Sequence, residues 1–290
     1  MTDDARGRKL LAIYAHPDDE SFGSGGTLAK YAAEGASVGL VCATNGESGE
    51  ISDPDLASSE TLGEVRIAEL KCAAEALGVT ELVLLGYRDS GMAGTADNED
   101  PRAFGNAAED EVVARLVGII RRVRPDVVVT FDPNGGYGHP DHVTVHDRTV
   151  AAFHAAGDAR SHRDEGEAWQ PHRLAYTVFA RSTFEQLRTK LTSSGADVGD
   201  LASWEEVLIL WEDEDVHVAL DVSGTVDAKW KALNCHRTQF GSDNLFRRIP
   251  EEMAREIMGR ENFAIAWPET PPGTRLAGLF DGLQGKNLSD

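Results

Sequence analysis

Short apolar runs alternate with segments of helical periodicity along most of this chain, and this alternation most limits its possible folds. The apolar runs predict strands at 10–15, 38–43, 81–85, 126–131, 174–179 and 216–220. The periodic segments predict helices at about 26–33, 61–77, 113–123, 142–155 and 225–237. The second helix opens with the capping-box pattern Thr61-Leu62-Gly63-Glu64. We therefore expect an α/β, Rossmann-like fold, with a mostly parallel sheet and helices on both faces.

The chain length fits a single folded domain. The chain has 290 residues, 41% of them hydrophobic, and no segment has the composition of an interdomain linker. We expect one domain over residues 1–290, with a C-terminal elaboration from about residue 181. The sequence carries no signal of the oligomeric state.

The charge balance argues against two classes of partner. The formal net charge is −21, whereas nucleic acids and anionic membranes are bound by clustered Lys and Arg. No apolar run approaches the ~18–20 residues of a membrane helix, and the polar N-terminus has no signal-peptide pattern. We expect a cytoplasmic protein that binds neither nucleic acid nor membrane.

The cysteines do not suggest a disulfide framework or a thiolate zinc site. Cys42, Cys72 and Cys235 are widely spaced, and no CxxC pair occurs. We expect buried free thiols.

Two predicted strands are followed directly by residues that bind metals or move protons. His16, Asp18 and Asp19 follow the first strand, and His139 and His142 follow the strand at 126–131. Ligands of parallel α/β sheets bind at the carboxyl ends of the strands, so both groups can meet at one edge of the sheet.

This set of side chains fits metal-assisted hydrolysis. A catalytic zinc takes three nitrogen or oxygen ligands and keeps one position for water, which leaves two of the five groups as acid and base. Two histidines and one aspartate also suit Fe²⁺. Alternatively, the aspartates after His-Pro are turn or cap residues, and 139–142 is an ordinary turn.

The motif Ala-His-Pro-Asp-Asp-Glu at 15–20 and the motif Gly-Gly-Tyr-Gly-His-Pro-Asp-His at 135–142 resemble those of the LmbE-like (PIG-L) zinc N-deacetylases. The segments 88–95 and 132–134 make the chain most similar to the mycothiol-pathway members, which act on N-acetylglucosaminyl-inositol. The resemblance covers residues 9–155. It implies a Zn²⁺-dependent hydrolase that removes an acetyl group from a small amino-sugar substrate.

The resemblance also implies roles for single residues. The zinc ligands of the family match His16, Asp19 and His142, and the general base matches Asp18. His139 matches a histidine that stabilises the oxyanion and helps to protonate the leaving amine.

Four further positions match residues near the substrate. Tyr137 matches a mobile tyrosine beside the scissile carbonyl, and Arg66, Asp89 and Met92 match substrate-binding positions. The alternatives are an arginine on a helix surface, an aspartate in a loop turn and a packed thioether.

Some alternatives remain open at this point. The related thiol-sugar conjugate amidases carry a lysine shortly after the first motif, and residues 21–25 contain none. A non-catalytic sugar- or metal-binding module would not need both Asp18 and His139. We expect His146 to lie outside the ligand set, where it points elsewhere or supports the ligands, and His236 to lie on a helix surface, with an approach to the pocket as the alternative.

Overall fold

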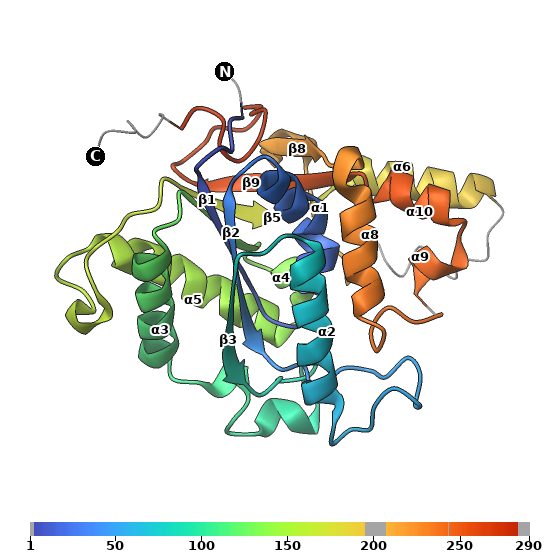
Figure 1. Cartoon of the computed structure of the whole chain (residues 1–290), viewed down its shortest axis with the longest axis horizontal. Coiled ribbons are helices and arrows are strands. Elements are labelled where there is room, and N and C mark those ends of the chain that lie inside the picture. The colour runs from blue at the N-terminus through green and yellow to red at the C-terminus, as the bar shows by residue number, and fades with distance from the viewer. Residues whose placement is uncertain (1–2, 195–206, 243, 284–290) are drawn as a thin grey trace.

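The computed structural model describes residues 3–194, 207–242 and 244–283. Its fold is built around a central sheet (Figure 1), which has seven strands. Its strands lie in the order β3 (Glu81–Tyr87), β2 (Ser37–Thr44), β1 (Lys9–Tyr14), β4 (Val127–Phe131), β5 (Arg173–Thr177), β9 (Arg260–Trp267) and β8 (Val218–Asp221). A second, two-stranded sheet pairs β6 (Phe179–Ala180) with β7 (Leu210–Trp211). The strands β3, β2, β1, β4 and β5 are parallel, which confirms the predicted fold class.

Helices cover both faces of the central sheet. The helices α3 (Glu109–Val123) and α5 (Pro140–Gly157) pack together on one face, and α1 (Asp19–Ala33), α2 (Leu62–Ala76) and α8 (Val226–Cys235) pack on the other (Figure 1). The remaining helices are α4 (Gly135–Gly138), α6 (Arg181–Ser194), α9 (Leu245–Arg248) and α10 (Glu251–Ile257). Because both faces are covered, β4 is buried along its whole length. Within the described ranges, no helix is both long and apolar enough to cross a bilayer.

The direction of the strand order changes between β1 and β4. The chain places β2 and then β3 on one side of β1, and crosses to the other side to form β4 and β5. In sheets of this kind, the loops after the two strands at the crossing point diverge and leave a crevice where ligands bind. The two motif loops are the loops after β1 and β4.

The apolar pattern does not predict β9, which runs antiparallel between β5 and β8. Its first half carries Glu261 and Asn262, polar side chains that the structure nevertheless buries. Both are bonded inside the protein: Asn262 donates to Thr183 Oγ1 at 3.1 Å, and Glu261 accepts from α1. Burial that depends on such distant partners leaves no periodic signal in the sequence.

The helix α1 begins at Asp19, earlier than the glycine-rich sequence suggests, and its glycines allow a close approach. A Cβ on Gly26 would lie 2.5 Å from Val222 Cγ2. The buried ion pair of Lys229 and Glu261, 2.6 Å apart, occupies the same region. Glu261 accepts the N–H of Gly26 at 2.8 Å, and Lys229 donates to the carbonyl of Phe22 at 3.1 Å. Both ends of one helical turn are thus bonded to the C-terminal part of the chain.

Helix α2 begins where the capping-box pattern places it, but the cap itself is absent. Thr61 has helical backbone angles and makes no side-chain bond to the helix. Its hydroxyl instead accepts the N–H of Ser58 at 3.0 Å. A cap hydroxyl normally requires an extended backbone at that residue, which Thr61 lacks.

The expectation of free thiols is wrong for two of the three cysteines. Cys72 on α2 and Cys235 at the end of α8 form a disulfide, whereas Cys42 is free and buried. The two bonded residues are 163 positions apart, and only the packing of α8 on α2 brings them together. Cysteine spacing could not have revealed this pair.

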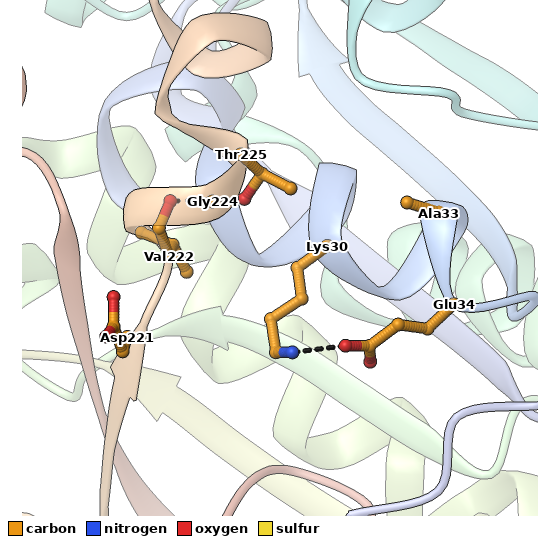
Figure 2. Close-up of a pocket in the computed structure, with 7 residues that line it drawn as sticks. All are labelled: Lys30, Ala33, Glu34, Asp221, Val222, Gly224 and Thr225. Carbon is orange, nitrogen blue, oxygen red and sulfur yellow. Dashed lines mark hydrogen bonds and ion pairs between the residues drawn. The ribbon is translucent and has the colours of Figure 1, made fainter.

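A surface hollow of about 200 Å³ lies between the last turns of α1 and the chain after β8, and Figure 2 shows the residues that line it. Lys30 and Glu34 form an ion pair on its wall, and Asp221 and Thr225 also line it. The α1 wall of this hollow is the C-terminal end of the helix, whose other end carries Asp19 of the first motif. It contains none of the predicted site residues.

The close approach at Gly26 predicts that a methyl group added there destabilises the protein more than one added at Gly224. Gly26→Ala should lower the free energy of unfolding by about 1–3 kcal/mol, because the new Cβ has no room beside Val222. Gly224→Ala is the matched control, since a Cβ there meets nothing within 4 Å. Urea unfolding of both variants checks this, and equal destabilisation would contradict the packing argument.

Candidate metal and catalytic site

The site lies where four loops leave the carboxyl ends of adjacent parallel strands. His16 follows β1, Asp89 follows β3, and His142 lies in the first turn of α5, after the loop that leaves β4. The loop after β2 contributes the backbone of Gly46 and Ser48, which bond to side chains of the site. The sheet therefore brings together residues that are more than 120 positions apart in the sequence, such as His16 and His142.

Three predicted ligand groups converge in this crevice. His16 Nδ1 and His142 Nε2 are 3.1 Å apart. The Asp19 carboxylate lies 3.3 Å from His142 Nε2 through Oδ1 and 3.6 Å from His16 Nδ1 through Oδ2. Ligand atoms held tetrahedrally at about 2.0–2.1 Å from one zinc ion lie about 3.3 Å from each other. The spacing of the three groups therefore fits a shared metal ion.

When both imidazoles are neutral, as metal binding requires, their outer hydrogen bonds leave the facing nitrogens without protons. His142 Nδ1 donates to the carbonyl of Gly135 at 3.1 Å, so its Nε2 carries a lone pair. His16 Nε2 donates to Asp141 Oδ2 at 3.1 Å, so its Nδ1 also carries one. Two such lone pairs beside a carboxylate repel unless a proton or a metal ion lies between them, and in the metal-free protein His16 can carry that proton. Outer hydrogen bonds of this kind are typical of metal-ligating histidines.

Asp141 is a site residue to which the motif analysis assigned no role. It is fully buried, and besides His16 it accepts the N–H of Ser90 at 2.9 Å and the Ser90 hydroxyl. Burial alone lowers the pKa of His16, but hydrogen bonds with the surrounding carboxylates, the strongest to Asp141, raise it well above its ordinary value. The crevice thus has a negative potential that attracts a cation. The signal was present in the sequence, since Asp141 stands inside the His-Pro-Asp-His motif.

Asp18 lies beside the ligand set and has an unusual backbone. Its φ of 126° falls in the region that side chains other than glycine rarely adopt. Its carboxylate accepts from the Arg66 guanidinium at 3.2 Å. Burial raises the pKa of Asp18 to about 6, although Arg66 acts in the opposite direction. A carboxylate of this kind is suited to exchange a proton near neutral pH.

His139 faces the same crevice, and one of its ring nitrogens is hydrogen-bonded within the protein. Its Nδ1 accepts the N–H of Asp141 at 3.1 Å, so the neutral ring carries its proton on Nε2. Burial and the neighbouring imidazoles of His16 and His142 lower the pKa of His139 to about 4. His139 could also serve as a ligand on distance alone, because His16, His139 and His142 offer nitrogens within 4.8 Å of one another.

Tyr137 lies at the mouth of the crevice, with its ring 5.0 Å from that of His142 and 39% of its surface exposed. It stands in the short helix α4, whose backbone depends on glycine. Gly135 has a φ of 65°, and a Cβ there would lie 2.6 Å from His142 Cβ. Gly135 therefore allows the loop to approach closely enough for its carbonyl to orient His142.

The three predicted substrate-binding residues differ in their surroundings. Arg66 is buried, so the helix-surface alternative is wrong; it donates to the carbonyls of Pro17 and Gly46 at 2.7 and 2.8 Å. Asp89 is buried near His16. It also accepts the N–H of Gly91 at 2.8 Å, which is the contact expected of an aspartate in a loop turn. Met92 is half exposed, so it is not a packed thioether.

Two other histidines were assigned from the sequence. His146 donates to the carbonyl of Phe131 at 2.8 Å and lies outside the ligand set, as expected. The prediction for His236 is wrong: α8 ends at Cys235, and His236 is fully buried with its Nε2 2.7 Å from Glu20 Oε1. The helical pattern continued past the true end of α8, which placed His236 on a helix face that does not exist.

Comparison with known proteins places this chain among deacetylases. The family model described as "GlcNAc-PI de-N-acetylase" (PIG-L) matches residues 11–153. The 1D-myo-inositol 2-acetamido-2-deoxy-alpha-D-glucopyranoside deacetylases of Geodermatophilus obscurus and Rhodococcus erythropolis are 40% and 43% identical to it; in both cases the match covers 96% of this chain and 99% of the relative.

Among solved structures, the N,N'-diacetylchitobiose deacetylase from Pyrococcus horikoshii shares the fold, with a TM-score of 0.63 and 23% identity, over 92% of this chain and 84% of that one. The full-length likeness to the two relatives, together with the family match over the motif-bearing half, shows that this chain belongs to the PIG-L family of de-N-acetylases.

Proposed function

We propose that this protein is a metal-dependent N-deacetylase that removes the acetyl group from an N-acetylglucosaminyl-inositol glycoside. The observation that carries the chemistry is the convergence of His16 Nδ1, His142 Nε2 and the Asp19 carboxylate within 3.6 Å of one another, beside Asp18. The substrate class comes from the two relatives at about 40% identity, which carry the name of that activity.

The donor set suits zinc, and His16, Asp19 and His142 would hold it. Two neutral imidazoles and one carboxylate are the usual protein ligands of a catalytic zinc, with a further position left for water or substrate. Bound there, zinc would polarise the acetyl carbonyl and lower the pKa of water toward neutrality. Fe²⁺ accepts the same ligands, so metal analysis of the protein decides between the two.

Asp18 would act as the general base. It takes a proton from the attacking water, whose oxygen forms a bond to the acetyl carbon. Arg66 holds one carboxylate oxygen of Asp18, so the direction of the base is fixed before substrate binds. Because a pKa near 6 lets the group both accept and return a proton, Asp18 can pass that proton to the leaving amine as the C–N bond breaks.

His139 would stabilise the oxyanion. With its Nδ1 occupied by the N–H of Asp141, it presents an Nε2–H donor toward the crevice. Tyr137, exposed at the mouth of the crevice, can add a second donor from its hydroxyl. The products are acetate and the free amino sugar, and the reaction consumes one water.

Three groups around the crevice would recognise the sugar. Arg66 keeps Nε without a hydrogen-bond partner among the described residues, although its other nitrogens are bonded. The Asp89 carboxylate can accept a sugar hydroxyl, and Met92 offers an exposed apolar surface. We assign these three residues to substrate binding.

Acetate release tests the proposed reaction. The protein should release acetate from N-acetylglucosaminyl-inositol faster than from free N-acetylglucosamine, and chelation followed by zinc readdition should abolish and restore this activity. Equal slow release from both substrates would refute the inositol preference. Hydrolysis only of a bulky thiol-sugar conjugate would instead favour the amidase alternative, and no release with metal bound would favour a binding module.

The base assignment predicts a loss of rate without a loss of metal. Asp18→Asn keeps the shape of the side chain but should lower kcat by about 10²–10⁴-fold, because the water loses its proton acceptor. Steady-state kinetics and metal analysis by mass spectrometry measure the two quantities. A variant with the wild-type kcat would contradict the assignment.

The ligand assignment predicts the opposite pattern. His142→Ala should lose most of its metal, because one of three ligands disappears. His146→Asn is the matched control: His146 lies one turn further along α5, is also buried, and contacts Phe131 and Asp147 outside the ligand set, so the metal should be retained. Similar metal contents in the two variants would rule out His142 as a ligand.

A further inference from the structure

The backbone of Asp18 is strained, so the surrounding structure must hold it. A φ of 126° and a ψ of −28° persist in a residue with a side chain only where several contacts fix them. Three are present. Arg66 binds the carboxylate at 3.2 Å, the N–H groups of Ser21 and Phe22 bind the carbonyl, and Glu20 Oε2 accepts the Asp18 N–H at 3.0 Å.

Glu20 is in turn held by a residue from the far end of the chain. Its other oxygen, Oε1, lies 2.7 Å from His236 Nε2. Burial lowers the pKa of His236, but the carboxylate of Glu20, together with those of Asp18 and Glu69, raises it above its ordinary value, so Nε2 keeps its proton. The other ring nitrogen, Nδ1, is buried without a partner among the described residues. The hydrogen bonding of the ring is therefore directed at Glu20.

The backbone around His236 is fastened to α2, the helix that carries Arg66. The preceding residue, Cys235, is disulfide-bonded to Cys72 of α2. Thr238, two residues on, donates from its N–H and its hydroxyl to Glu69 of the same helix at 2.9 and 2.6 Å. Arg66, which binds the Asp18 carboxylate, lies on α2. His236, which binds Glu20 and so holds the partner of the Asp18 N–H, is connected to the same helix.

We propose that His236 is a positioning residue, which acts through Glu20 on the backbone of Asp18 and thereby aims the catalytic carboxylate. This inference rests on the proposed deacetylase function, in which Asp18 is the base. His236 itself touches neither the ligand set nor the proposed substrate groups in the contacts of the described residues.

Steady-state kinetics on N-acetylglucosaminyl-inositol distinguish a positioning role of His236 from a role in folding alone. His236→Ala should lower kcat by about 10- to 100-fold, as is typical when an outer hydrogen bond of a site is lost. KM should change by less than about threefold and the metal content should stay at the wild-type level, because neither substrate groups nor ligands are altered. His236→Gln should recover most of the rate, since its amide can donate to Glu20 from a similar position.

His217→Ala is the matched control. His217 is also a buried histidine from the C-terminal part, with Nδ1 bonded to the Ile265 N–H at 2.9 Å and Nε2 without a partner among the described residues. This variant should lose stability comparably but keep kcat. An equal loss of kcat in the two variants would reduce the role of His236 to folding and overturn the proposal.

A double-mutant cycle tests whether His236 acts through Glu20. Glu20→Gln alone should lower kcat, and the Glu20→Gln/His236→Ala double variant should be no slower than the slower single variant, because both break the same chain of contacts. Multiplied losses would show independent action and contradict the inference. An unchanged kcat in His236→Ala would do so as well.

Crystal structures of the wild type and of His236→Ala keep this test separate from that of the proposed function. If the wild type releases no acetate from any probe, the proposed function fails, but the two structures still report the Asp18 backbone. A shift of its φ away from 126° supports the positioning role, and an unchanged Asp18 refutes it.

Discussion

Two imidazole nitrogens and a carboxylate face one another inside the protein, and the surrounding structure holds them there. The facing nitrogens of His16 and His142 are 3.1 Å apart and buried, an arrangement that a flexible chain would relax. The two strands that lead into the crevice prevent this, because β1 pairs along its length with β2, β4 pairs along its length with β5, and the two pair with each other. Such preorganisation on strand ends is what gives a catalytic site its geometric precision.

The surrounding carboxylates offset the unfavourable contact and select for a cation. Asp141 and Asp89 approach one side of His16, and Asp19 approaches the other. Because water is largely excluded, these charges act at a low effective dielectric constant and their effect is strong. The acidic crevice thus follows local requirements and needs no reference to the high negative charge of the whole chain.

Much of the fold and of the candidate site could be predicted from the sequence because the information is local. The parallel strands carry their own apolar runs, and the proposed ligands and base stand in two short motifs at strand ends. The site roles remain predictions, since the structure shows their convergence and not their chemistry. What could not be predicted depends on distant partners: β9 hides buried polar residues, and the Cys72–Cys235 disulfide joins segments 163 positions apart. The single-domain prediction remains untested.

Because Glu261 of β9 binds the N–H groups of Gly26 and Thr27, the helix that begins beside the crevice is completed by the last strand that the structure describes. On the ribosome, the whole proposed ligand set emerges well before this strand does. A nascent chain that has all three ligands therefore still has an uncovered glycine face on α1 and lacks its buried ion pair. The proposed ligand set and the contacts that complete α1 are thus synthesised at different times, and only the C-terminal part of the chain brings the second to the first.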